Sequence, residues 1–187
     1  MVMINKMIKL RPHQQKVIEA FDKGFRNIIL LWSRRAGKSI FAWNLLIREA
    51  IYRPGTYWFC FDEFRTAERN IWSAMTSDGV KFRDMIPKEM ILSENVSKLK
   101  IELINGSTIQ LVGINNADNL VGAGLMGVVF DEYAVLNPNS IDYITPMLAE
   151  TGGWQVVIST PRGENHFYER WQFAQAHPET WYSSNVH

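Results

Sequence analysis

Four short apolar runs, each followed by a helical pattern, constrain the fold of this chain more than any other feature. The runs are NIILLW (27–32), TYWFCF (56–61), GVVFDE (127–132) and WQVVIST (154–160). Near-continuous apolar runs of this length are typical of strands buried on both faces. Helical patterns follow these runs at 40–55, 63–75, 138–149 and 164–176, and another precedes the first run at 11–24. Strands that alternate with helices predict an α/β fold, with a mainly parallel central sheet and helices on both faces.

One segment departs from this alternation. KIELINGSTIQLVG (100–113) holds two strand-like runs around Asn105-Gly106, which is the strongest short-range signal for a β-hairpin. Neither a repeat nor an obvious linker divides the chain, so we expect residues 1–187 to form a single domain.

Composition indicates a globular protein with a large core, since 47% of the residues are hydrophobic and 12% are aromatic. No apolar stretch approaches the ~20 residues that cross a bilayer, so we expect no membrane association. The one cysteine, Cys60, lies within an apolar run, and we expect a buried, unreactive thiol. These features fit a reducing cytoplasm.

LLWSRRAGKSIF (30–41) ends as a phosphate-binding loop does. Gly37, Lys38 and Ser39 match the end of the pattern G-x-x-x-x-G-K-[ST], but Trp32 stands where its first glycine belongs. In such a loop Lys38 reaches the β- and γ-phosphates of ATP, and the Ser39 hydroxyl binds Mg²⁺. Gly37 lets the backbone approach the phosphates closely. Gly-Lys-Ser alone is a weak signal, so further motifs are needed.

The run GVVFDE supplies an acidic pair. Asp131 is expected to hold Mg²⁺, and Glu132 to orient and deprotonate the attacking water. Adjacent side chains on an extended strand end point in different directions, which would let the pair divide these tasks. The alternative is an acid pair at a helix N-terminus or in a solvated loop.

Two further motifs carry polar side chains. In ISTPRG, Ser159 or Thr160 could bind the γ-phosphate or the attacking water, and Pro161 stiffens the turn. The alternative is a turn that caps the next helix. In KLRPHQ, the amide of Gln14 could pair with the edge of adenine, and the alternative is a solvated helix residue.

The motifs SRRAGKS, DE and STPRG each come directly after an apolar run. In open parallel sheets, ligands bind at the carboxyl ends of the strands. We therefore expect these motifs to meet at one edge, with a Mg²⁺-bound triphosphate between Lys38 and the pair at 131–132.

The net charge of +1 hides an asymmetry along the chain. Residues 1–50 hold 10 Lys and Arg against 3 Asp and Glu, whereas residues 101–150 hold 6 acids and no Lys or Arg. This distribution indicates an anionic ligand near the N-terminal half, but it does not by itself establish DNA binding.

Together these motifs, from Leu10 to about Trp171, resemble the N-terminal ATPase domain of a large terminase subunit, the DNA-packaging motor of tailed phages. That family tolerates a loop without the first glycine and places Arg within it, as in S-R-Q-x-G-K-[ST]. LRPHQ resembles the family's adenine motif. INGSTIQLVG and the run into FDEYA, where a small Ala134 follows the acids, resemble its hairpin and second ATPase motif. The stretch STPRG-ENHFYERW resembles its coupling motif, which carries the ATP state to the DNA-moving parts.

The resemblance implies a role for each matching residue. Ser33-Arg34-Arg35-Ala36-Gly37-Lys38-Ser39 would bind ATP together with Gln14. Arg34 would act with Lys38 and Glu132 in catalysis, as a permanently charged donor to the phosphates. Ser39 and Asp131 would bind the metal. The coupling motif would comprise Ser159, Thr160 and Pro161.

For the whole protein the resemblance implies a three-layer P-loop NTPase fold of the RecA-like (ASCE) class. It implies Mg²⁺-dependent ATP hydrolysis that drives double-stranded viral DNA into a procapsid, with ATP and Mg²⁺ as cofactors. The implied partners are the portal protein of the procapsid, the small terminase subunit and further copies in a homo-oligomeric ring, expected to be a pentamer. The implied location is the host cell cytoplasm.

Two departures from the family pattern matter. Many members have Leu-Arg-Gly before the acidic pair, and that Arg is a candidate finger that reaches a neighbouring subunit's ATP. Here Val121 takes its place. Any finger must then come from elsewhere, and the candidates are Arg65, Arg69, Arg83 and Arg162. Large terminases also continue into a nuclease domain. We therefore expect an ATPase domain excised from a longer chain, with a naturally split subunit as the alternative, and no nuclease activity from these residues.

Two other readings stay open. Superfamily-two helicases share a Gln-containing entry motif, the two ATPase motifs and a Ser-Ala-Thr element, but they need a second RecA-like domain. A nucleotide-gated assembly module with little turnover is the other reading, and Val121 gives it some support.

Overall fold

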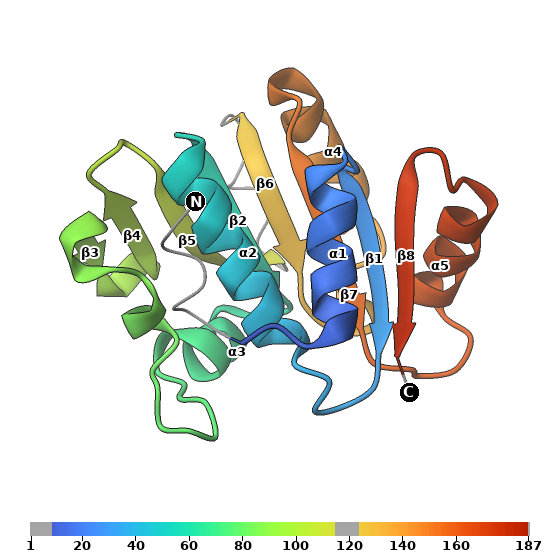
Figure 1. Cartoon of the computed structure of the whole chain (residues 1–187), viewed down its shortest axis with the longest axis horizontal. Helices are drawn as coiled ribbons and strands as arrows, with labels where there is room; N and C mark the ends of the chain where they lie inside the picture. The colour runs from blue at the N-terminus through green and yellow to red at the C-terminus, as the bar shows by residue number, and fades with distance from the viewer. Residues whose placement is uncertain (1–8, 115–123, 187) are drawn as a thin grey trace.

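The computed structural model describes residues 9–114 and 124–186 (Figure 1). Within these residues eight strands form one sheet in the order β3-β4-β5-β2-β6-β7-β1-β8. β4 runs antiparallel to β3 and β5, whereas β5, β2, β6, β7, β1 and β8 run parallel to one another. The mainly parallel sheet and the hairpin are thus confirmed. The strands span Asn27–Trp32 (β1), Thr56–Phe61 (β2), Ile91–Asn95 (β3), Lys100–Leu103 (β4), Thr108–Gly113 (β5), Leu125–Phe130 (β6), Trp154–Ser159 (β7) and Trp181–Val186 (β8).

Helices cover both faces of the sheet (Figure 1). One core cluster joins α1 and α2 to one face, and a second joins α4 and α5 to the other. This is the predicted three-layer architecture. The helices span Pro12–Asp22 (α1), Lys38–Tyr52 (α2), Phe64–Ala67 (α3), Ser140–Thr151 (α4) and His166–Ala176 (α5), with a π-helical turn at Glu68–Trp72 and 3₁₀ turns at Arg83–Met85, Lys88–Met90, Val96–Lys98 and Tyr133–Val135.

The side chains of β1 show why the apolar runs form central strands. Ile28 and Leu30 enter the core cluster under α1 and α2, whereas Ile29 enters the cluster under α4 and α5. Successive side chains of a strand point to opposite faces, so a strand covered on both sides must be apolar throughout. Cys60 of β2 is fully buried, as expected, and burial raises the pKa of its thiol.

The segment after β2 differs from its prediction. A single helix was expected over 63–75, but the structure has α3 and then the π-helical turn. Ala67, Ile71 and Trp72 are all buried there. A π turn is wider than an α turn and can direct residues i, i+4 and i+5 to one side, which fits this burial pattern.

The sequence patterns missed β3 and β8, the two outermost strands. Their sequences are ILSEN and WYSSNV, and most of their side chains are at least partly exposed. Edge strands lack a buried neighbour on one side, so they need no continuous apolar run. In the described ranges, no helix combines the length and the apolar content that crossing a membrane requires.

Candidate active site

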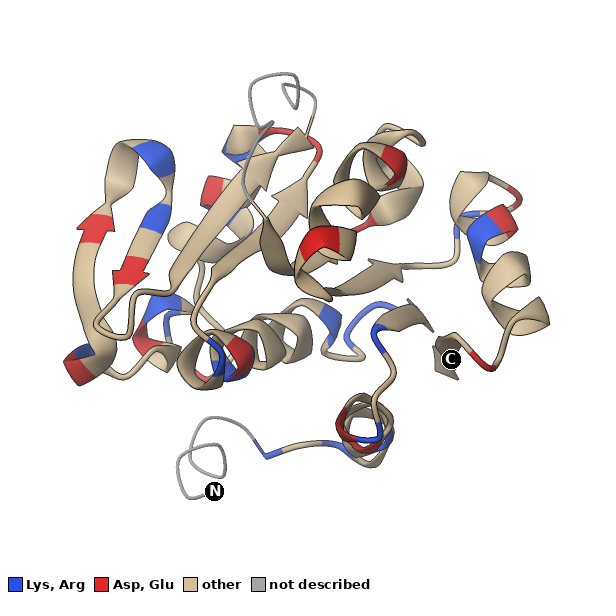
Figure 2. Ribbon diagram, turned by 90° about the horizontal axis from the view of Figure 1, so that it is seen from above, with Lys and Arg blue, Asp and Glu red and all other residues tan. Residues whose placement is uncertain are grey.

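An open cleft of about 1780 Å³ lies at the carboxyl ends of the central strands. It is lined by α1, by the segment 75–85, by Glu132 and Thr160, and by the loop between β1 and α2, here called the phosphate loop (residues 33–39). The phosphate loop contributes Arg34, Arg35, Gly37, Lys38 and Ser39 to this lining, but not Ser33 or Ala36. Charged positions of both signs lie on the helices, the loops and the strands β3 and β4, and no single face of the ribbon is purely basic (Figure 2).

The phosphate loop is shaped by two left-handed residues. Arg35 has φ = 66° and Gly37, the residue before α2, has φ = 82°. Among the described residues no side chain caps the N-terminus of α2. The first amide groups of a helix lack intrahelical partners, and the helix dipole favours negative charge there. This arrangement suits an anion.

Side chains of α1 and of its preceding residue hold the phosphate loop from behind. Arg11 Nη1, His13 Nε2 and Gln14 Nε2 donate to the carbonyl groups of residues 35, 36 and 37, over 2.8, 3.0 and 3.3 Å. A carbonyl oxygen can only accept, so Nε2 of His13 carries the proton. The sequence patterns missed Arg11 and His13 as functional residues, because no spacing rule links them to a loop more than twenty residues away.

Gln14 is only 2% exposed, so its reading as a solvated residue is wrong. Its Oε1 accepts a hydrogen bond from the Arg11 amide over 2.9 Å, and its Nε2 donates to Gly37. Both ends of the amide are therefore engaged within the protein. The pairing of Gln14 with adenine stays a prediction, and it would require at least one of these bonds to be exchanged.

Trp32 explains why the first glycine of the loop pattern is absent. This position is the last residue of β1, and the indole is fully buried. Its Nε1 donates to Ser184 Oγ over 3.0 Å, and its ring meets that of His13 edge-on at 4.6 Å. The phosphate loop therefore begins after Trp32, and the tryptophan is part of the core.

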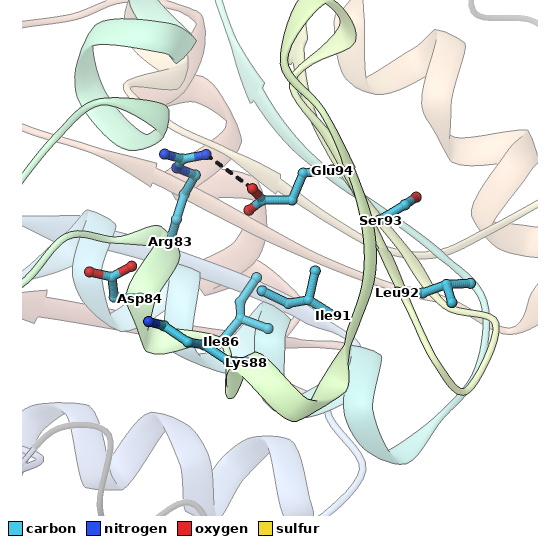
Figure 3. A pocket seen from close by; sticks show the side chains of 8 residues that line it. All are labelled: Arg83, Asp84, Ile86, Lys88, Ile91, Leu92, Ser93 and Glu94. Atoms are coloured by element: carbon cyan, nitrogen blue, oxygen red, sulfur yellow. Dashed lines mark hydrogen bonds and ion pairs between the residues drawn. The ribbon is translucent and has the colours of Figure 1, made fainter.

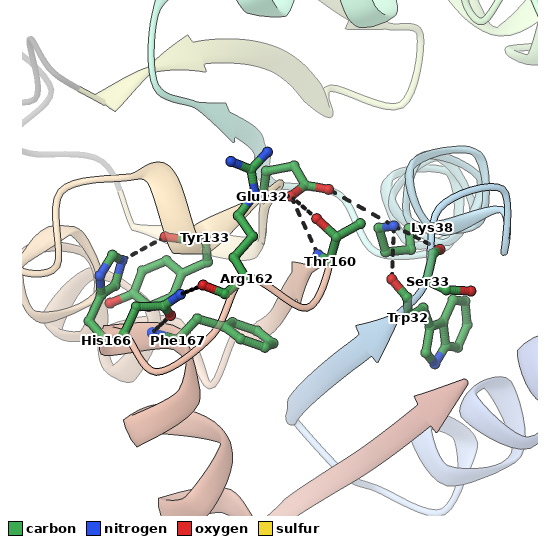
Figure 4. Close-up of polar contacts among 10 residues, drawn as sticks. Trp32, Ser33, Lys38, Glu132, Tyr133, Thr160, Arg162, His166 and Phe167 are labelled. Carbon is green, nitrogen blue, oxygen red and sulfur yellow. Dashed lines mark hydrogen bonds and ion pairs between the residues drawn. The ribbon is translucent and has the colours of Figure 1, made fainter. Parts of the chain in front are cut away.

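Lys38 and Glu132 face each other across the site, with Thr160 beside them (Figure 4). Lys38 Nζ donates to the carbonyl groups of Trp32 and Ser33 over 3.0 and 3.1 Å, and it lies 3.9 Å from Glu132 Oε1. Burial lowers the pKa of Lys38, an effect that Glu132 and Asp131 oppose. The predicted convergence of the strand ends is thus observed.

Ser39 and Asp131 form the second link across the strands. Ser39 Oγ donates to Asp131 Oδ2 over 2.9 Å. Oδ1 of Asp131 is buried and has no hydrogen-bond partner among the described residues. Burial raises the pKa of Asp131 to about 6, although the bond from Ser39 opposes this shift. A hydroxyl and a carboxylate with a spare buried oxygen suit a hard cation such as Mg²⁺.

The chain bends at Glu132, within a segment that we call the acidic turn (residues 131–136). β6 ends at Phe130, and Glu132 has φ = 51° and ψ = 50°. The expectation of an extended strand end at Glu132 is therefore wrong, and the left-handed bend separates the two carboxylates instead. Glu132 Oε2 accepts hydrogen bonds from the hydroxyl and amide of Thr160 over 2.8 and 3.4 Å, and lies 3.7 Å from Arg162 Nε.

The remaining residues of the third motif differ from Thr160. Ser159 is fully buried and Pro161 is exposed, and neither lines the cleft. The capping alternative is wrong, because Asn165 caps α5 by accepting from the amides of Phe167 and Tyr168.

The finger candidates occupy different environments. Arg162 contacts its own chain's Glu132. Arg83 lies at a separate cavity of about 440 Å³, where it pairs with Glu94 at 3.3 Å (Figure 3) and stacks over Trp72. Arg65 and Arg69 are exposed near α3. Val121 lies outside the described residues.

Comparisons with known proteins find a matching family and similar sequences. Residues 29–182 match the family described as terminase large subunit, T4likevirus-type, N-terminal. The large terminase subunit of Escherichia phage T5 is 29% identical over 153 residues, which cover 79% of this chain and 33% of that protein. The chain spans about a third of the length of the curated relatives that it matches.

Two solved structures are similar in fold. The large terminase ATPase domain of Thermus phage P74-26 superposes with a TM-score of 0.77 at 20% identity, over 95% of this chain and 81% of that one. The large terminase of another thermophilic bacteriophage, solved in complex with ADP, gives a TM-score of 0.75 at 16% identity, over 95% of this chain and 45% of that one.

Proposed function

The chain belongs to the large terminase family, of which it matches the N-terminal domain, and we propose that it binds ATP and hydrolyses it in a Mg²⁺-dependent reaction. The observation that carries this proposal is the meeting of Lys38 with Glu132, and of Ser39 with Asp131, at the carboxyl ends of β1 and β6. Phosphoryl transfer depends mostly on positioning and charge stabilisation, and these groups supply both.

Each group has a role in this reaction. The amides at the start of α2 and the Lys38 ammonium hold the β- and γ-phosphates, and Arg34 adds a second cation from the rim of the cleft. Glu132 orients the attacking water and accepts its proton. Thr160 donates to Oε2 of the same carboxylate, so it fixes the direction in which Glu132 presents its other oxygen, Oε1.

Ser39 and Asp131 would hold the Mg²⁺, directly or through water. When bound, the ion would neutralise the negative charge on the phosphate oxygens. The described residues contain no cluster of three or more His, Cys, Asp or Glu side chains arranged around a metal position, so Asp131 would be joined by a hydroxyl and by non-protein ligands. This fits Mg²⁺, which usually takes only one or two protein carboxylates together with waters and phosphates.

For the whole protein, we propose that residues 1–187 form one ATPase domain of a packaging motor. Hydrolysis would drive double-stranded DNA into a procapsid in the host cytoplasm. The motor would be a homo-oligomeric ring, with the portal protein of the procapsid and the small terminase subunit as its partners. Family membership supports this assignment, and the cations that line the cleft are consistent with it.

The test is titration calorimetry of Lys38→Ala with ATP and Mg²⁺. The variant lacks a charged hydrogen-bond donor. A hydrogen bond from such a donor contributes about 1.5–3 kcal/mol, so its loss should weaken ATP binding roughly 10- to 100-fold. Lys100→Ala is a matched control, because Lys100 pairs with Glu102 in β4 and does not line the cleft. Chelation of Mg²⁺ should abolish phosphate release by the wild-type protein. Unchanged affinity in Lys38→Ala, or turnover without a divalent cation, would contradict the proposal.

A further inference from the structure

The backbone of the acidic turn is strained at Glu132, so contacts with its surroundings must stabilise this conformation. Glu132 is a non-glycine residue in the left-handed region, where the Cβ lies too close to the following carbonyl oxygen. Such residues persist only where neighbouring contacts determine their conformation, and they cluster at functional sites. The contacts that hold Glu132 therefore bear on the direction of its carboxylate.

Tyr133, the next residue, anchors this bend. Its side chain is 1% exposed, and its ring meets that of Phe130 edge-on at 5.9 Å. Its hydroxyl donates to the carbonyl of Pro138 over 2.8 Å. The backbone carbonyl of Tyr133 accepts a hydrogen bond from the Leu136 amide over 3.0 Å. With Tyr133 held in the core, the chain can rotate at Glu132 only if these contacts break.

His166 closes the same anchor from another element. Its Nε2 lies 2.7 Å from the Tyr133 carbonyl oxygen, and its ring meets the Tyr133 ring edge-on at 4.9 Å (Figure 4). The oxygen can only accept, so the imidazole donates. His166 is the first residue of α5, and Asn165 caps this helix by accepting from the amides of Phe167 and Tyr168.

The segment that holds His166 also holds the carboxylate. Thr160 and Arg162 contact the side chain of Glu132, and His166 contacts the backbone one residue later. The segment 160–166 thus contacts the acidic turn at two points, one on the reacting group and one on its support. A fixed carboxylate needs both, because the side chain follows the backbone that carries it.

We propose that His166 is a positioning residue for hydrolysis, which acts through the Tyr133 carbonyl to hold Glu132 in its left-handed conformation. This inference rests on the proposed function, in which Glu132 activates water. His166 is not among the residues that line the cleft. Its loss should lower kcat and leave nucleotide binding unchanged.

The experiment compares His166→Phe, which keeps a ring but removes the donor, with His166→Gln, which keeps an N–H of similar reach. We expect His166→Phe to lower kcat at least tenfold with the ATP Kd unchanged within twofold, and His166→Gln to recover most of the loss. His177→Phe is the matched control. His177 also donates to a backbone carbonyl within α5 and stacks on Phe173, but it lies at the other end of the helix. It should keep wild-type kcat.

A second measurement separates positioning from general stability. In a Glu132→Gln background the carboxylate is already gone, so adding His166→Phe should reduce the residual phosphate release no further. Should His166→Phe not fold, His166→Ala replaces it with the same expectation. Wild-type kcat in the donor-free variants, equal losses of kcat and nucleotide affinity, or full additivity with Glu132→Gln would overturn the proposal. Wild-type protein that binds no ATP or never hydrolyses it would instead overturn the proposed function.

Discussion

The phosphate loop and the acidic turn face each other across one cleft, but they are built differently. The phosphate loop has its turn written in its own sequence, through Gly37 at φ = 82° and the start of α2 directly after it, and distant side chains of α1 and the residue before it brace that turn. The acidic turn takes its shape from distant residues, since Thr160 and His166 contact it from 28 and 33 positions away. Distant residues thus contact both halves of the site, but only the phosphate loop carries a local sequence signal for its bend, the glycine at its left-handed position.

The largest expected effect lies on the acidic side. Glu132→Gln removes the proton acceptor but keeps the size and shape of the side chain, so turnover should fall roughly 10²- to 10⁴-fold. ATP affinity should stay within a few-fold of wild type. Phosphate release and calorimetry on the same protein measure both quantities. Wild-type turnover would remove Glu132 from catalysis and leave the acidic turn without a chemical role.

A smaller effect is expected on the phosphate side. In Gly37→Ala the new Cβ meets Gln14 Nε2 at 2.8 Å, in a left-handed conformation that costs a side chain roughly 1–2 kcal/mol. Unfolding free energy should fall by about that amount. ATP affinity should fall on the order of tenfold, which corresponds to about 1.4 kcal/mol.

Gly106→Ala is the control for this variant. Gly106 also has positive φ, at 87°, but nothing lies within 4 Å of its added Cβ, and it turns the hairpin between β4 and β5. It should lose similar stability and no ATP affinity. If both variants bind ATP equally well, the phosphate loop tolerates distortion and is less locally determined than the comparison states.

The smallest effect concerns the side chains that hold the phosphate loop from behind. Arg11→Ala removes one hydrogen bond to the Arg35 carbonyl, worth about 0.5–1.5 kcal/mol, and ATP affinity should fall roughly 2- to 10-fold. Arg26→Ala is matched, because Arg26 donates to the carbonyls of Phe21 and Phe25 near the other end of α1. The measurement is calorimetric. A loss of ATP affinity as large in Arg26→Ala would attribute the effect to the stability of α1.

The same contrast explains how much could be predicted from sequence. The central strands, the phosphate loop and the acidic pair follow from local patterns, and the structure confirms their convergence. Arg11, His13 and His166 carry no local signal, since their partners lie more than twenty residues away. The bend at Glu132 was missed for a related reason, because neighbouring packing and not propensity imposes a left-handed glutamate.

Edge strands were lost for a different physical reason. WYSSNV pairs with β1 along its whole length, but its side chains are mostly half-exposed and carry no apolar run. Backbone hydrogen bonds largely define such a strand, and every residue except proline can make them. β8 nevertheless bears on the site, since the Val186 carbonyl accepts from the Ser33 amide over 2.8 Å at the start of the phosphate loop.

β7 pairs with β1 on one side and β6 on the other, so the lysine-bearing and acid-bearing strands never touch. Two inter-strand spacings, about 9–10 Å in total, therefore set the width between the strands that lead into the phosphate loop and the acidic turn, and the side chains of Lys38 and Glu132 span it to within 3.9 Å of each other. A buried substitution in β7 that tilts or widens the sheet would change this width without altering any group that contacts the nucleotide. β7 therefore sets the distance between the strands that precede the phosphate loop and the acidic turn.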